Sequence, residues 1–280
     1  MKTMHSIIVC TTLMICSISV VFGYNKAKDG TYYADFNGDG KHDIFLYDKT
    51  KGTGVVWGWG GKKWKTLWEN NTFRKTWQVH LGDFDGNGKT DMFLYDKAKG
   101  HGVVWGWSGK SWSTLWENKT FRKTWQVHVG DFNGDKKSDM FLYDKGKGTG
   151  VLYSINPKQK KGKTLWENKT FRKTWDIYPG DITGTGKTAL FLYDKKAGDG
   201  VVFGWDNKGK FKTLWENKTF RKTWDIYPGD VNGDKKVDLF LYDKKAGTGV
   251  LFGWDGKKTF KTLWENKTFR KTWNVFTMVK

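Results

Sequence analysis

The sequence predicts an all-β protein, a single five-bladed β-propeller with four antiparallel strands in each blade. Three observations predict this fold. One unit recurs five times along the chain, and each unit holds four short apolar segments separated by turn residues. In addition, no segment shows the capped 3.6-residue apolar period of a helix.

The repeat is defined by an acidic loop followed by an apolar segment, as in GDFDGNGKTDMFLYDK. Its first acidic residue recurs with periods of 48, 48, 50 and 49 residues. A second block, TLWEN-x-TFRKTW, also occurs five times and ends at a tryptophan. The repeats span about 24–76, 77–124, 125–174, 175–223 and 224–273, so one propeller is expected to fill residues 24–280.

Each element of one unit follows from its local pattern. The segment TWQVHLGDF alternates in hydropathy and leads into a Gly/Asp/Asn turn, and DMFLYD is a short apolar run. A Lys/Gly turn then leads to GVVWGW, and a Gly turn leads to WSTLWEN. Four strands in such a repeat are typical of a propeller blade, whereas the alternative, a β-helix solenoid, needs shorter coils.

Both ends of the propeller carry a copy of the first strand of a blade. The closing segment, residues 273–280, matches TWQVHLGDF but has no blade after it, and DGTYYADF supplies the same position in the first blade. One of these segments is expected to complete the ring by pairing across the seam, since this removes exposed sheet edges.

Residues 1–23 are interpreted as a secretory signal peptide. Lys2 and His5 precede the apolar run Ser6–Phe22, and small residues favour cleavage after Gly23. The alternative, a membrane anchor, is disfavoured because the run is short. We therefore expect a secreted, extracellular protein with no membrane insertion after cleavage.

The composition excludes a disulfide-stabilised protein and an intrinsically disordered one. Cleavage would remove both cysteines, Cys10 and Cys16, so stability must come from the core, from repetition or from metal ions. A content of 17% aromatic residues excludes intrinsic disorder despite a formal net charge of +20.

The acidic loops predict structural calcium sites. Calcium prefers six to eight oxygen ligands at about 2.3–2.6 Å, and Asp or Asn at loop positions 1, 3, 5 and 9, with a backbone carbonyl at position 7, can supply them. Four loops carry the set, which gives about four Ca²⁺ sites. The residues are Asp35, Asn37, Asp39, Lys41, Asp43, Asp83, Asp85, Asn87, Lys89, Asp91, Asp131, Asn133, Asp135, Lys137, Asp139, Asp230, Asn232, Asp234, Lys236 and Asp238.

The fourth loop is a vestige, because it carries Asp181, Thr183, Thr185 and Ala189 at those positions. The alternative interpretation of all five loops is a tight turn whose side chains bond their own backbone. Lys136 and Lys235 replace the glycine at position six, so weaker binding is expected in those two loops.

The loop Asp-x-Asn/Asp-Gly-Asp/Asn-Gly-x-x-Asp, followed by IFLYD or MFLYD, resembles the FG-GAP/VCBS repeat family. That family includes the integrin α-chain propeller and propeller lectins such as the Psathyrella velutina lectin. The resemblance implies a propeller with calcium in the loops of one face and ligand contacts on or between blades. Family members usually have six or seven blades, and a five-bladed ring is closer in size to the tachylectin-2 type of lectin.

Every arginine occupies one repeat position, in the connection between consecutive blades. One interpretation is that each arginine pairs with the nearby glutamate and links adjacent blades. The other is a ring of guanidinium groups that binds anionic or hydroxyl-rich ligands. The residues are Arg74, Arg122, Arg172, Arg221 and Arg270.

Aromatic pairs alternate along the third strand of each unit, and most of these rings are expected to pack between blades. Indole faces also stack on pyranose rings and can donate to a hydroxyl. Near strand ends the sugar-binding candidates are Trp59, Trp107, Trp205 and Trp254.

Five N-glycosylation sequons fall at one repeat position, which predicts solvent-facing loops. The alternative is that their Asn and Thr build a turn. The acceptors are Asn70, Asn118, Asn168, Asn217 and Asn266.

Two histidines, His80 and His128, share a repeat position with Tyr178, Tyr227 and Phe276. This interchange indicates a packing ring and not a metal ligand or a base. No Gly-x-Ser-x-Gly motif, phosphate loop or Cys/His cluster occurs, so the protein is not expected to be an enzyme; a glycosidase is the enzymatic alternative.

Five nearly equal blades favour several equal binding sites over one asymmetric catalytic site. We therefore expect a calcium-stabilised, multivalent lectin, a monomer that recognises glycans. One alternative is a protein-binding adhesion module. That function predicts a single asymmetric patch, and residues 146–163 are the only strongly divergent stretch among the repeats. The other is an electrostatic binder of acidic polysaccharides, which the net charge would attract.

Overall fold

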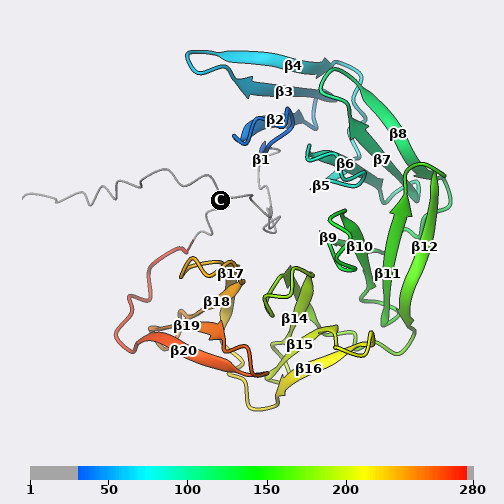
Figure 1. The fold of residues 1–280 in the computed structure, drawn as a ribbon. Helices are drawn as coiled ribbons and strands as arrows, with labels where there is room; N and C mark the ends of the chain where they lie inside the picture. The colour runs from blue at the N-terminus through cyan, green and yellow to red at the C-terminus, as the bar shows by residue number, and fades with distance from the viewer. Residues whose placement is uncertain (1–30, 276–280) are drawn as a thin grey trace, which may run out of the picture.

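The computed structural model describes residues 31–275. The predicted signal peptide, the start of the first repeat and residues 276–280 of the predicted closing segment lie outside this range. Within it, the secondary structure consists of twenty strands and contains no helix. The strands form five sheets of four antiparallel strands, each in sequential order. We number these sheets blades 1 to 5 (Figure 1).

The strands follow the four apolar segments of each unit. The first strands are β1 (Thr31–Ala34), β5 (Gln78–Gly82), β9 (Gln126–Gly130), β13 (Asp176–Gly180) and β17 (Asp225–Gly229). The second strands are β2 (Asp43–Asp48), β6 (Asp91–Asp96), β10 (Asp139–Asp144), β14 (Ala189–Asp194) and β18 (Asp238–Asp243).

The outer half of each blade repeats equally well. The third strands are β3 (Thr53–Trp59), β7 (His101–Trp107), β11 (Thr149–Asn156), β15 (Asp199–Trp205) and β19 (Thr248–Trp254). The fourth strands are β4 (Trp64–Asn70), β8 (Trp112–Asn118), β12 (Lys161–Asn168), β16 (Phe211–Asn217) and β20 (Phe260–Asn266). The register between the third and fourth strands shifts once in every blade.

The hydrophobic core lies between blades. Four clusters of buried side chains each join one blade to the next. Between blades 1 and 2, for example, Phe45 and Val56 pack with Met92 and Trp107. Because a fully buried side chain of this kind contributes about 1.5–3 kcal/mol, these junctions supply most of the apolar stabilisation. We call the side of a blade that faces the next blade its front face, and the opposite side its back face.

The five blades follow an arc around a central axis, with a gap between blade 5 and blade 1 (Figure 1). The predicted starting strand exists, since β1 pairs with β2 inside blade 1. In the described part of the chain no strand pairing joins blade 5 to blade 1.

Candidate functional site

The acidic loops lie between the first and second strands of the blades. In the blade 2 loop, Asp83 accepts hydrogen bonds from the N–H groups of Gly86 at 2.7 Å and Gly88 at 2.9 Å. Asp91, which opens β6, accepts one from the Phe84 N–H at 2.8 Å. The loop therefore folds through its own carboxylates, as the turn interpretation requires.

The same loop also concentrates negative charge. Carboxylate oxygens of Asp83, Asp85 and Asp91 all lie within 4.8 Å of one another. Burial raises the pKa of Asp91 to about 7; the Trp107 N–H lowers it, and the charges of Asp85 and Asp83 raise it. A cation held by these oxygens would remove this repulsion, so the donor set of the blade 2 loop fits Ca²⁺.

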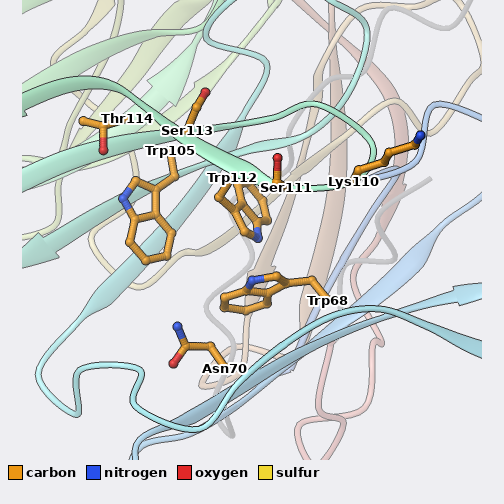
Figure 2. Close-up of a pocket in the computed structure, with 8 residues that line it drawn as sticks. All are labelled: Trp68, Asn70, Trp105, Lys110, Ser111, Trp112, Ser113 and Thr114. Carbon is orange, nitrogen blue, oxygen red and sulfur yellow. The ribbon is translucent and has the colours of Figure 1, made fainter.

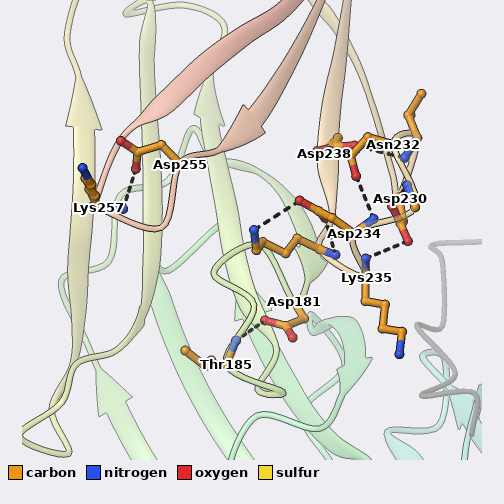
Figure 3. Close-up of polar contacts among 12 residues, drawn as sticks. Asp181, Thr185, Asp230, Asn232, Asp234, Lys235, Asp238, Asp255 and Lys257 are labelled. Carbon is orange, nitrogen blue, oxygen red and sulfur yellow. Dashed lines mark hydrogen bonds and ion pairs between the residues drawn. The ribbon is translucent and has the colours of Figure 1, made fainter.

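The equivalent buried carboxylates behave alike in the other three complete loops. Burial is the largest cause in each: it raises the pKa of Asp43 to about 6 and that of Asp139 to about 7, and it raises the pKa of Asp238. The blade 4 loop lacks this carboxylate, and its Thr183 and Thr185 hydroxyls lie 3.2 Å apart. Figure 3 shows Asp181 and Thr185 of that loop beside the loop of blade 5.

Two loops carry lysine where the turn needs a left-handed residue. Lys136 and Lys235 have φ of 65° and 67°, whereas the glycines at this position, Gly40 and Gly88, have φ of 79° and 78°. A left-handed conformation costs a non-glycine residue about 1–2 kcal/mol, so these two loops store strain. Weaker Ca²⁺ binding in these two loops stays a prediction.

Consecutive loops are joined by backbone hydrogen bonds. The carbonyl of the first Asp in one loop accepts from the N–H that precedes the ninth position of the next. The four bonds are Thr90 to Asp35, Ser138 to Asp83, Thr188 to Asp131 and Val237 to Asp181, at 2.6–2.9 Å. The loops therefore form one connected face of the propeller.

The arginines link adjacent blades, but through aspartate. Arg122 Nη1 lies 3.3 Å from Asp144 Oδ2, and Thr124 donates to the same oxygen at 2.6 Å. The interpretation that each arginine pairs with a nearby glutamate is wrong. The guanidinium instead pairs with the aspartate that ends the second strand of the next blade. The equivalent pairs are Arg74–Asp96, Arg172–Asp194 and Arg221–Asp243.

Each of these four arginines also stacks on the tryptophan three residues later, with 4.3–4.6 Å between guanidinium carbon and ring centroid. We call the Arg, Thr and Asp together the blade latch. Although burial by itself raises the pKa of Asp144, hydrogen bonds from Thr124 and Lys147 and the charge of Arg122 hold it below its usual value. The guanidinium therefore has a structural partner at four of the five predicted positions.

A groove opens between the outer strands of blades 1 and 2, with a volume of about 400 Å³. Trp68, Trp105 and Trp112 present their rings to it, as Figure 2 shows. The Trp112 Nε1 is buried without a hydrogen-bond partner among the described residues. Polar groups surround the aromatic part: Asn70, Lys110, Ser111, Ser113 and Thr114.

The same groove recurs between blades 4 and 5, with about 470 Å³. Trp215 and Asn217 are the equivalents of Trp68 and Asn70, Phe252 and Phe260 take the places of Trp105 and Trp112, and Thr259 and Thr262 add hydroxyl groups. These grooves were not predicted from the sequence. The recurring Trp of TLWEN indicates one wall of each groove. The aromatic residues of the opposite wall belong to the next blade, so the sequence repeat does not identify them.

The four predicted sugar-binding tryptophans are placed unequally. Trp107 and Trp254 are 1% and 7% exposed, so other side chains cover their indole faces. Trp205 is partly buried against Phe211. Trp59 is exposed and packs edge-on against Trp64. The groove tryptophans are therefore better placed to meet a ligand than Trp107 or Trp254.

The sequon residues form turns at the end of each fourth strand. Asn70 Oδ1 accepts hydrogen bonds from the N–H of Thr72 at 2.7 Å and from its hydroxyl at 3.1 Å, and the other four sequons repeat this pair. The threonines are exposed. Since Asn70 and Asn217 also line the grooves, a glycan attached there would stand at the groove mouth.

The two inner histidines pack as the sequence indicated. His80 and His128 lie against Phe93 and Phe141 at 5.9 and 6.5 Å between centroids. Burial lowers the pKa of His80 to about 4 and that of His128 to about 3. Both rings are therefore neutral at physiological pH.

The five four-stranded sheets and their recurring acidic loops define the chain as an all-β, five-bladed β-propeller. The FG-GAP-like repeat profile matches residues 35–94, and the remaining blades repeat the same loop and strands. The resemblance stated from the loop motif is thereby confirmed. No curated protein matches the sequence.

Solved structures share the fold at low identity. A Lactobacillus plantarum protein aligns with 82% of this chain and 69% of its own, at 12% identity and a TM-score of 0.54. The Photorhabdus luminescens Tc holotoxin pore aligns with 89% of this chain, at 17% identity and a TM-score of 0.55. The matched region is only 12% of the holotoxin chain. Both matches concern the fold alone.

Among residues 31–275, no helix has the length and hydropathy needed to cross a bilayer.

Proposed function

We propose that this protein is a multivalent carbohydrate-binding protein whose saccharide sites are the grooves between adjacent blades. The observation that carries the proposal is the recurrence of one groove at two junctions, with aromatic rings surrounded by hydroxyl and amide groups. Indole faces accept the C–H face of a pyranose, and Asn, Ser and Thr can bond its hydroxyls. Equal sites around a propeller turn weak single contacts into useful avidity.

In this proposal the protein binds glycans without cleaving them. It is exported, and it acts on extracellular or cell-surface glycans. The arginines contribute to blade packing more than to the ligand, since four of them already pair with aspartate.

A glycan array tests the proposal. Binding to neutral sugars such as N-acetylhexosamines should persist at high salt, because stacking on aromatic rings does not depend on charge. The double variant Thr114→Arg/Thr262→Arg places a bulky side chain at the exposed rim of both grooves and should lower the signal about tenfold. The control Thr50→Arg adds the same charge in an exposed turn outside the grooves.

Other array results would replace the proposal. Binding confined to sulfated or acidic glycans and abolished by salt would move the function to the Lys/Arg surface. A blank array would favour the protein-binding adhesion module.

We also propose that Ca²⁺ stabilises the loops of blades 1, 2, 3 and 5. The ligands would be the Asp and Asn side chains at loop positions 1, 3, 5 and 9 and the backbone carbonyl at position 7, and the convergence of Asp83, Asp85 and Asp91 supports this. The ion would bind the folded chain only, so it would fix the turn between the first two strands of each blade.

Removal of the ion tests this role. Adding Ca²⁺ to chelator-treated protein at about 100 times its dissociation constant should stabilise the fold by ~2.7 kcal/mol per site. Calorimetric titration should count four ions, and Asp85→Ala should remove one. The matched control Asp181→Ala, in the incomplete loop, should leave the count unchanged. A melting temperature that does not respond to chelator would contradict the proposal.

A further inference from the structure

The asparagines of two sequons lie on the same strand face as a groove tryptophan. On β4, Trp68 and Asn70 are two residues apart, so both point to the front face of blade 1, and both line the groove. Figure 2 shows the Asn70 carboxamide directed toward the rings. Trp215 and Asn217 have the same places in the second groove. A sugar attached to either asparagine would therefore begin at the edge of an aromatic groove.

The turn of the sequon fixes the carboxamide and leaves its nitrogen available. Asn70 Oδ1 accepts both turn bonds from Thr72, so Nδ2, the atom that carries an N-linked sugar, takes part in neither. The asparagine of an acidic loop differs, because Asn37 Nδ2 donates to Asp43 Oδ1 at 3.2 Å. The direction in which a sugar would leave Asn70 Nδ2 is therefore set by the turn.

The opposite wall of the first groove offers ring faces and hydroxyl groups. Trp105 and Trp112 are partly exposed, and their ring centroids lie 6.4 Å apart with 36° between the ring planes. Ser113 and Thr114 lie beside them. The groove volume of about 400 Å³ is at the lower end for small-molecule sites, which suits one or two sugar residues. These groups match the C–H face and the hydroxyls of a pyranose.

The junction of blades 2 and 3 carries the same sequon beside a covered ring. In blade 3, Gly162 stands at the position that Trp112 has in blade 2, and a Cβ on this glycine would overlap the Tyr153 ring. Tyr153 therefore fills this space and packs on Trp116, with 5.8 Å between centroids. Trp116 is only 3% exposed. A sugar on Asn118 would leave the same kind of turn but would meet a covered indole.

We propose that the groove between blades 1 and 2 holds the first N-acetylglucosamine of an N-linked glycan on Asn70, stacked on Trp105 and Trp112, and that glycosylation thereby closes the groove to free saccharides. A glycan on Asn217 would fill the groove between blades 4 and 5 in the same way. A short tether keeps the attached sugar at an effective concentration on the order of millimolar, so a weak stacking contact is enough. The closure to free saccharides rests on the proposed function, whereas the packing of the attached sugar does not.

Attachment requires a transferase of the secretory pathway, with a lipid-pyrophosphate-linked oligosaccharide as the donor. Asn70 Nδ2 loses one proton and forms a bond to C1 of the first N-acetylglucosamine. The bond from C1 to the pyrophosphate oxygen breaks, and the lipid pyrophosphate leaves with that electron pair. Nothing is oxidised or reduced. The protein would thus occur in an unmodified form with open grooves and a modified form with filled grooves.

Two chains with one sequon each test the proposal. The first keeps Asn70 and the second keeps Asn118, and every other sequon asparagine is changed to aspartate, as in Asn168→Asp. A carboxylate oxygen can accept the two turn bonds but cannot carry the sugar. Both chains are secreted from a eukaryotic host and trimmed with an endoglycosidase to one N-acetylglucosamine. The same chains exported by a bacterial host without the transferase supply the unmodified forms.

The sugar on Asn70 should lower the equilibrium constant for unfolding in urea about fivefold, the size of one aromatic contact. The sugar on Asn118 should leave it almost unchanged. In NMR spectra the acetamido methyl protons of the Asn70 sugar should move upfield, because an indole ring shields protons above its face. Trp105→Val should abolish the fivefold difference, since comparing the two forms of one variant cancels the packing lost with the indole.

Three results would overturn the proposal. They are equal effects of the sugar at the two sequons, unshifted methyl protons on the Asn70 sugar, and secretion of the chain with Asn70 unmodified. If Trp105→Val does not fold, the comparison of Asn70 with Asn118 and the methyl shift still decide.

Binding of free sugar is measured separately. Native mass spectrometry with N-acetylglucosamine should show one bound sugar fewer for the modified Asn70 chain than for its unmodified form. If neither form binds free sugar but the methyl shift is present, the proposed function fails and the packing of the attached sugar stands. Equal binding by both forms would overturn the closure of the groove.

Discussion

Replacing Asp144 with alanine should destabilise the propeller by about 3 kcal/mol. The side chain of Asp144 is 1% exposed and accepts hydrogen bonds from Arg122, Thr124 and the Lys147 N–H. The substitution leaves these donors unpaired at the junction of blades 2 and 3, and unpaired donors cost more than the pair itself gains. Urea unfolding followed by tryptophan fluorescence measures the loss.

The matched control is Lys145→Ala, one residue further along. Lys145 pairs with Asp176 at 3.4 Å, but both side chains are about half exposed. Such pairs contribute about 0–1 kcal/mol, so this variant should unfold almost as the parent does. Equal losses for the two variants would show that the blade latch does not stabilise the junction.

Acidification should destabilise the protein between pH 6.5 and pH 4 through its two inner histidines. The folded pKa values of His80 and His128 are lowered to about 4 and about 3 by burial, against an ordinary value of 6.5. Below pH 6.5 the unfolded chain therefore binds more protons, so stability falls as the pH decreases. By pH 4 the loss reaches about 3 kcal/mol for each histidine.

The double variant His80→Tyr/His128→Tyr should remove most of this loss. Blades 4 and 5 already place Tyr178 and Tyr227 at the same position, so the junction accepts the ring. Urea unfolding at pH 7.5, 5.5 and 4.5 should show curves that diverge as the pH falls. His42→Tyr, at an exposed loop residue, is the control and should follow the parent. Parallel curves for the double variant and the parent would refute the prediction.

Much of the fold can be predicted from the sequence because its signals are local. Alternation in segments such as TWQVHLGDF follows from the two-residue period of a strand, and the turns follow from glycine at positions that need a positive φ, such as Gly88. The same holds for the acidic loops, whose residues lie within nine positions of one another. Their carboxylates meet in blade 2 as the spacing implies.

The side-chain contacts between adjacent blades could not be predicted from the sequence. Arg122 pairs with Asp144, 22 residues away in the next blade, although Glu117 is closer in sequence. The groove likewise joins Trp68 of one blade to Trp112 of another. Each contact depends on how two blades are rotated and spaced, and a repeat pattern carries no information about that.

The sequence by itself determined the five repeats, the four strands of each blade, their turns and the positions of the acidic loops, because backbone geometry couples neighbouring residues directly. Only the tertiary structure decided which aspartate each arginine meets, which tryptophans line a groove and which two faces remain uncovered. The reason is that the five units are nearly identical. Their side chains acquire different surroundings only when the blades pack, and the two end blades each lack one neighbour.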